Sequence, residues 1–172
     1  IPADFRHRAA AGCLDIAMEH QKAIVLLTAK RLYGPAFSLM RLITESYVRG
    51  IWIHKCANEK ELEKFSKGRV PDFYKLLEDV EKLESHQDGT LSRMKESAWN
   101  AMNDFTHTGF QHAVRRQTET SIEANYSDGE IREAVNFANA LGHLAAIAIC
   151  DLANNAELAS IILDKIKHNE AA

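Results

Sequence analysis

The sequence predicts an all-α protein, a single-domain bundle of about five or six helices. Apolar residues recur at intervals of three and four through most of the 172 residues, which is the spacing of a helix face. Glycine and proline, 8 and 3 in number, fall between these stretches and mark their ends. No stretch alternates apolar and polar residues, so we expect no strands. We expect residues 1–172 to form one domain.

Two long helices are expected first. Residues 3–32 carry an apolar stripe, and Pro2 suits a helix start. Gly34 ends this helix, and Pro35 takes the tolerated first position of the next. Residues 35–57 are apolar around most of the circumference, which predicts the central helix of the bundle.

Shorter and more polar segments follow. We expect a short charged helix over residues 58–67, a helix from Pro71, a long helix from Thr90, and a final short helix over residues 156–167. Residues 110–127 have no firm periodicity, and loops of that length are often functional.

The last long helix begins at residue 128 and is rich in small side chains. Ala138, Gly142 and Ala145 lie on one seam. They would let another helix approach closely, either within this chain or in a second copy.

Composition limits the possible functions. Apolar residues make up 46% of the chain and charged residues 26%, as in ordinary soluble proteins. The net charge of −3 argues against a DNA clamp. No apolar run reaches the roughly 18 residues of a membrane span, and we recognise no signal peptide, so we expect a cytoplasmic protein. Cys13, Cys56 and Cys150 are expected to be core thiols rather than disulfide partners or metal ligands.

A polar stripe is the first sign of a site. Trp99, Asn103 and His107 are spaced four residues apart, so a helix places an indole, an amide and an imidazole on one side. If that helix ends at Gly109, the imidazole lies in its last turn, where the backbone carbonyls favour the protonated form.

The central helix contains a second pair of candidates, Arg41 and Glu45, one turn apart. They are either a structural ion pair or part of a site that faces the stripe of Trp99. Metal and cofactor sites are not expected, because Glu-x-x-His pairs, zinc-ligand spacing and phosphate loops are absent.

One reaction fits these residue types, namely acid–base chemistry on a ribose–phosphate bond. His107 supplies the titratable group and Asn103 an orienting amide, while the phosphate needs a cation. Arg41, Arg115 or Arg116 would have to supply that cation.

Several blocks of sequence resemble a known family. Residues 36–52, His107-Thr108-Gly109-x-Gln111, Arg115-Arg116 and Asn125-Tyr126 are similar to an uncharacterised family of bacterial all-helical proteins. The run from Asn103 to His107 is more distantly similar to the signature of the HEPN superfamily, helical domains common in toxin–antitoxin and phage-defence ribonucleases. In that signature an Arg, a polar residue and three others precede the catalytic His. Met102 stands at the Arg position.

The resemblance implies an HEPN-like fold, a homodimer with two sites at a shared cleft, RNA as the partner, and metal-independent ribonuclease activity. Met102 argues against cleavage by the usual route unless another Arg substitutes. Two alternatives stay open: a homo-oligomeric helical interaction module, and a small-ligand pocket lined by tryptophans and the Arg41–Glu45 pair. The expected binding residues are Trp52, Trp99, Gln111, Arg115, Arg116 and Tyr126.

Overall fold

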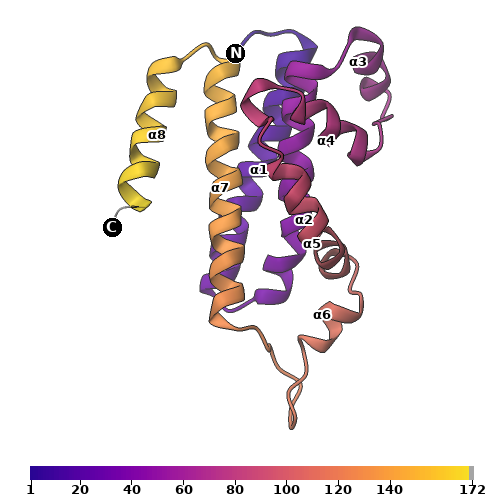
Figure 1. Ribbon diagram of the computed structural model, residues 1–172, viewed down its shortest axis with the longest axis vertical. Coiled ribbons are helices and arrows are strands. Elements are labelled where there is room, and N and C mark those ends of the chain that lie inside the picture. Colours follow the sequence, from indigo (N-terminus) through magenta and orange to yellow (C-terminus); the bar gives the residue numbers. More distant parts are fainter. Residues whose placement is uncertain (171–172) are drawn as a thin grey trace.

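The computed structural model describes residues 1–170, which form eight α-helices and no strands (Figure 1). The all-α prediction is therefore confirmed, but the expected five or six helices were too few. The elements are α1 (Phe5–Ala29), α2 (Tyr33–Ile51), the π-helical turn η1 (Trp52–Cys56), α3 (Glu59–Ser66), α4 (Phe73–Glu81), the short 3₁₀ turn η2 (Glu84–His86), α5 (Thr90–Thr106), α6 (Phe110–Val114), α7 (Asp128–Leu152) and α8 (Ala156–Glu170). Helix α6 lies in the segment expected to be irregular, because five residues are too few to show a period.

Three long helices, α1, α2 and α7, run side by side and form the body of the molecule (Figure 1). Helix α2 packs against both of the others and also against α5, as predicted for the central helix. Its face toward them is fully buried, with Ile43, Tyr47 and Val48 each at most 2% exposed.

The end of α2 departs from the expected regular helix. The chain winds into the π-helical turn η1, and the Ala57 N–H donates to the Trp52 carbonyl at 2.8 Å. The last carbonyls of a helix have no partner within it. Here the Arg6 guanidinium donates to the carbonyls of Ile53 and Ala57, at 3.0 Å and 2.6 Å, and so closes this end of the helix.

The small residues of α7 serve packing within the chain. A Cβ atom added to Gly142 would lie 2.6 Å from Cγ of Gln21, so α1 and α7 approach closely there. The Gln21 amide donates to Asn139 Oδ1 at 2.8 Å across the same contact. The seam anticipated from the sequence therefore faces α1.

Helix α7 is apolar beyond what the sequence analysis anticipated. Within residues 1–170 it alone is long and apolar enough to cross a membrane by length and composition, with a mean hydropathy of 1.4 over 18 residues. Core helices of bundles meet the same criteria, and α7 packs against α1, α2 and α8. Only 33% of this window is buried, so one side of α7 remains uncovered.

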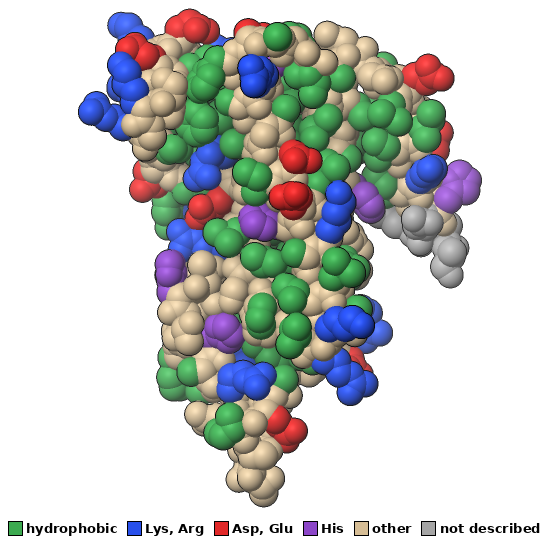
Figure 2. Space-filling view, turned by 180° about the vertical axis from the view of Figure 1, so that it is seen from behind, with side chains coloured by type: hydrophobic (Ala, Val, Ile, Leu, Met, Phe, Trp, Pro, Cys, Tyr) green, Lys and Arg blue, Asp and Glu red, His purple; other side chains and the backbone are tan. Residues whose placement is uncertain are grey.

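Helix α8 projects from the bundle and packs mainly on α7. Figure 2 shows hydrophobic side chains on the arm that leads to the grey C-terminal residues. Leu158 and Ile161 are each 45% exposed.

The cysteines lie in helical turns, as expected. Cys150 is buried, Cys13 and Cys56 are half-buried, and all three are free thiols.

Candidate functional site

Helix α5 presents the predicted stripe toward α2, where Arg41 meets all three of its polar or aromatic side chains. The Arg41 Nη1 donates to Asn103 Oδ1 and lies 3.2 Å from His107 Nε2. Its guanidinium carbon lies 5.0 Å from the centre of the Trp99 ring, within the range of a cation–π contact. Together with Glu45 these residues form what we call the Arg41 cluster.

Glu45 holds the guanidinium in place. Its Oε1 accepts from Arg41 Nε at 2.7 Å, and its Oε2 lies 3.7 Å from Nη2 of Arg49. The i, i+4 ion pair and the contact with the Trp99 stripe, which were alternatives in the sequence, therefore occur together. Within residues 1–170 the Arg41 Nη2 group makes no hydrogen bond, so two N–H donors of the fork are available to a ligand.

Phe73 stacks on the Trp99 ring, a contact that the sequence did not reveal. The two rings are parallel within 5°, and their centres are 4.4 Å apart. Phe73 is the first residue of α4, which the chain brings against α5. The indole is therefore held between Phe73 of α4 and Arg41 of α2, and its side chain loses little conformational entropy when a ligand binds.

The end of α5 differs from the expectation. The helix ends at Thr106, His107 is its C-cap, and Thr108, not Gly109, has the left-handed backbone, with φ 55°. The Gly109 N–H donates back to the Asp104 carbonyl at 2.7 Å, which closes a Schellman-type end.

Gly109 is required for space rather than for a left-handed conformation. A Cβ atom there would lie 2.6 Å from Cγ of Asp104. The Asp104 carboxylate passes over this point and accepts the Gln111 N–H at 2.8 Å, at the start of α6. This network fixes the turn that carries His107.

The contact with Arg41 also defines the hydrogen-bonding role of His107. A guanidinium can only donate, so Nε2 of His107 accepts and the ring proton lies on Nδ1. Asn103 and His107 are both exposed, so the cluster is open to solvent.

Trp52 and Gln111, two of the predicted binding residues, lie outside the cluster. Trp52 is completely buried, and its indole N–H donates to Asp79 Oδ2 at 3.3 Å. It belongs to the core because the turn η1, which begins at Trp52, packs against α1, α2 and α4. Gln111 is tied to Asp104 through its backbone only.

The remaining predicted binding residues lie around α6 and the loop after it. Arg115 forms an ion pair with Glu130 at the start of α7, and Arg116 is exposed. The Tyr126 ring packs on Phe37, with ring centres 4.8 Å apart. Neither arginine of this pair contacts His107, so Arg41 is the cation that the fold places there.

The chain matches a family of unknown function, DUF6988, over residues 14–170, and it belongs to that family. Membership of an uncharacterised family, as expected from the sequence blocks, is thus confirmed. No curated protein and no solved structure matches the chain significantly. The similarity to the HEPN superfamily and a bacterial origin remain predictions.

Proposed function

For this member of the DUF6988 family we propose an HEPN-like function: the Arg41 cluster binds RNA and cleaves it without a metal ion. The observation that carries the proposal is the distance of 3.2 Å between Arg41 Nη1 and His107 Nε2. Arg41 supplies, from α2, the cation that the HEPN signature places five residues before the histidine.

The position of Met102 explains why the cation has to come from another helix. Met102 is 6% exposed and packs in the core. A charged side chain there would be buried, at a cost that isolated charges rarely overcome. Arg41 faces the same histidine from α2 with its charge near the surface.

The chemistry follows from the donors and acceptors of the cluster. The ribose 2′-oxygen attacks phosphorus, and the O2′–P bond forms as the P–O5′ bond breaks. The 2′-hydroxyl displaces Arg41 Nη1 from His107 Nε2, which then takes the hydroxyl proton, and the leaving 5′-oxygen takes a proton from water. The free N–H donors of Arg41 stabilise the charge on the phosphoryl oxygens, and Asn103 orients the ribose. The products are a 2′,3′-cyclic phosphate and a 5′-hydroxyl.

The test uses the full chain, a labelled single-stranded RNA and EDTA. We expect cleavage that survives EDTA, and His107→Ala to slow it by about 100-fold or more. Arg41→Ala should weaken RNA binding as well as cleavage, and Glu45 keeps Arg49 as a partner in that variant. His168→Ala and Arg132→Ala, which alter exposed side chains on α8 and α7, are the matched controls.

The outcomes separate binding from catalysis. If the unmodified chain and His107→Ala both cleave RNA only at the background rate, the proposed ribonuclease activity is refuted and only the proposed RNA binding remains. If Arg41→Ala also binds RNA as well as the controls do, the RNA proposal fails. A loss of stability in His107→Ala well beyond about 1–2 kcal/mol marks the histidine as structural.

The proposal includes a homodimer, since HEPN-like domains join two sites at a shared cleft. Sedimentation velocity of the full chain tests this point. A monomer at the concentrations used for cleavage contradicts it.

A further inference from the structure

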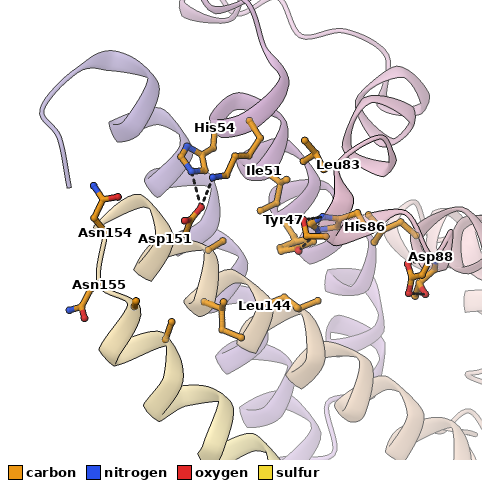
Figure 3. A pocket seen from close by; sticks show the side chains of 18 residues that line it. Tyr47, Ile51, His54, Leu83, His86, Asp88, Leu144, Asp151, Asn154 and Asn155 are labelled. Carbon is orange, nitrogen blue, oxygen red and sulfur yellow. Dashed lines mark hydrogen bonds and ion pairs between the residues drawn. The ribbon is translucent and has the colours of Figure 1, made fainter.

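A second hollow lies apart from the Arg41 cluster and shares none of its residues. It is a pocket of about 740 Å³, bounded by α2, η1, residues 83–91, α7 and α8 (Figure 3). This volume is within the range of pockets that enclose small organic molecules. The pocket exists because α8 packs mainly on α7 and leaves space between itself and α2.

The walls of the pocket are mostly apolar. Ile51 and Leu91, at 5% and 8% exposed, line its inner side, and Leu144 of α7, at 44%, is open to it. Ala148 and Ala159 face it from α7 and α8, and their short side chains leave the space unfilled.

The charged groups of the pocket are satisfied within its own wall. The Lys55 ammonium lies 2.6 Å from Asp151 Oδ2, and His54 Nε2 lies 3.2 Å from the same oxygen. Asp88 accepts the Thr90 N–H at 3.1 Å and its hydroxyl at 2.6 Å. Lys55 and Asp151 neutralise each other, and Asp88 leaves one negative charge at the wall, which disfavours an anionic ligand.

The two histidines of the pocket add no charge at neutral pH. Burial is the largest influence on both His54 and His86, and it lowers the pKa of each ring below its ordinary value. In the view of Figure 3, Ile51 lies between the two rings.

The hydrogen-bonded chain Tyr47–His86–Ser85 leaves one of its own donors free in this wall. His86 Nε2 lies 2.9 Å from the Tyr47 hydroxyl, and its Nδ1 lies 2.8 Å from Ser85 Oγ. A neutral imidazole donates from one nitrogen and accepts at the other. If Tyr47 donates to the ring, the ring donates to Ser85 and the serine proton is free. In the other tautomer the tyrosine proton is free. Either way one hydroxyl that lines the pocket can donate outward.

We infer that this pocket binds an uncharged, largely apolar small molecule that carries a hydrogen-bond acceptor such as a carbonyl oxygen. The apolar walls take up the body of the molecule, and the free hydroxyl of the Tyr47–His86–Ser85 chain donates to the acceptor. Paired charges at the rim disfavour an ionic ligand, which would have to break the Lys55–Asp151 pair.

The experiment uses Nile red, which is uncharged, apolar and carries a carbonyl group, with the anionic dye anilinonaphthalene sulfonate for comparison. We expect saturable binding of one Nile red per chain with a blue shift of its emission, and clearly weaker binding of the anionic dye. Ala148→Trp and, separately, Ala159→Trp should each weaken Nile red binding by about tenfold or more, because the indole occupies the space.

Ala140→Trp is the matched control, since Ala140 lies on the same helix α7, is exposed and does not line the pocket. Circular dichroism and thermal melting establish that each variant is folded. Two variants on different helices keep the test decisive if one does not fold. Equal loss of binding in Ala140→Trp overturns the inference, as does unchanged binding in both filled variants.

A tighter complex with the anionic dye than with Nile red also overturns the inference. The same holds if the filled variants bind Nile red normally but change the sedimentation coefficient, because a second copy of the chain would then be the occupant.

Discussion

Replacing Gly142 by Ala tests whether α1 and α7 are held as close as the structure indicates. The new methyl would lie 2.6 Å from Cγ and 2.9 Å from Cβ of Gln21, inside normal contact distance. Since Cβ cannot move without its helix, the two helices must separate. Overpacking of this kind costs about 1–3 kcal/mol, while Ala improves helix propensity over Gly by about 1 kcal/mol. The net effect should be a loss of about 0–2 kcal/mol.

Gly12→Ala is the matched control, because a Cβ atom there meets nothing within 4 Å. It gains the helix propensity without a clash and should raise the free energy of unfolding by about 0.5–1 kcal/mol. Urea unfolding and thermal melting, both followed by far-UV circular dichroism, measure the two variants side by side. For a chain of this size each kcal/mol shifts Tm by about 2–4 °C. If Gly142→Ala stabilises the protein as much as Gly12→Ala does, the close approach of α1 and α7 is refuted.

Three further predictions concern a turn, a buried phenol and a helix start. Thr108 has φ 55°, a conformation unfavourable for a β-branched residue, so Thr108→Gly should raise stability by about 1 kcal/mol in urea unfolding, and a loss would show that no strain exists there. Burial raises the pKa of Tyr47 to about 12, so its contribution to stability is complete below the unfolded value of about 10 and is lost as the pH rises from 10 to 12. Burial also raises the pKa of Tyr126, so ultraviolet titration should show late phenols of which Tyr47→Phe removes the one near 12, and the persistence of that one would contradict the assignment. Ser127 caps α7 reciprocally with Glu130, so Ser127→Ala should lower the free energy of unfolding by about 1 kcal/mol, whereas an unchanged melting curve would show that the cap is dispensable.

The Arg41 cluster shows how far sequence periodicity reaches toward a site. The spacing of Trp99, Asn103 and His107 fixed their common side, because a helix repeats every 3.6 residues whatever its surroundings. Arg41 and Glu45 are four residues apart, so the same helical repeat predicted their contact. That these two sets face each other depends on how α2 packs against α5, which local spacing does not encode.

Trp52 was misassigned and Phe73 was missed for the same reason, because the packing of helices against one another decides the surroundings of both. Trp52 was predicted as a binding residue, yet the turn η1 places it in the core, where its indole N–H donates to Asp79. Phe73 carried no signal of its own, and it supports Trp99 only because α4 folds back against α5. The pocket beside α8 was equally invisible, because it is defined by the space that several helices leave between them.

The sequence by itself determined the all-α class, the central place of α2 and the stripes on each helix, since these follow from helical periodicity and from where glycine and proline interrupt it. Tertiary structure decided which stripes meet. It chose Arg41 rather than Arg115 or Arg116 as the neighbour of His107, and it turned the small residues of α7 toward α1. The physical reason is that contacts between helices depend on crossing geometry and close packing over the whole core, to which residues distant in the chain contribute together.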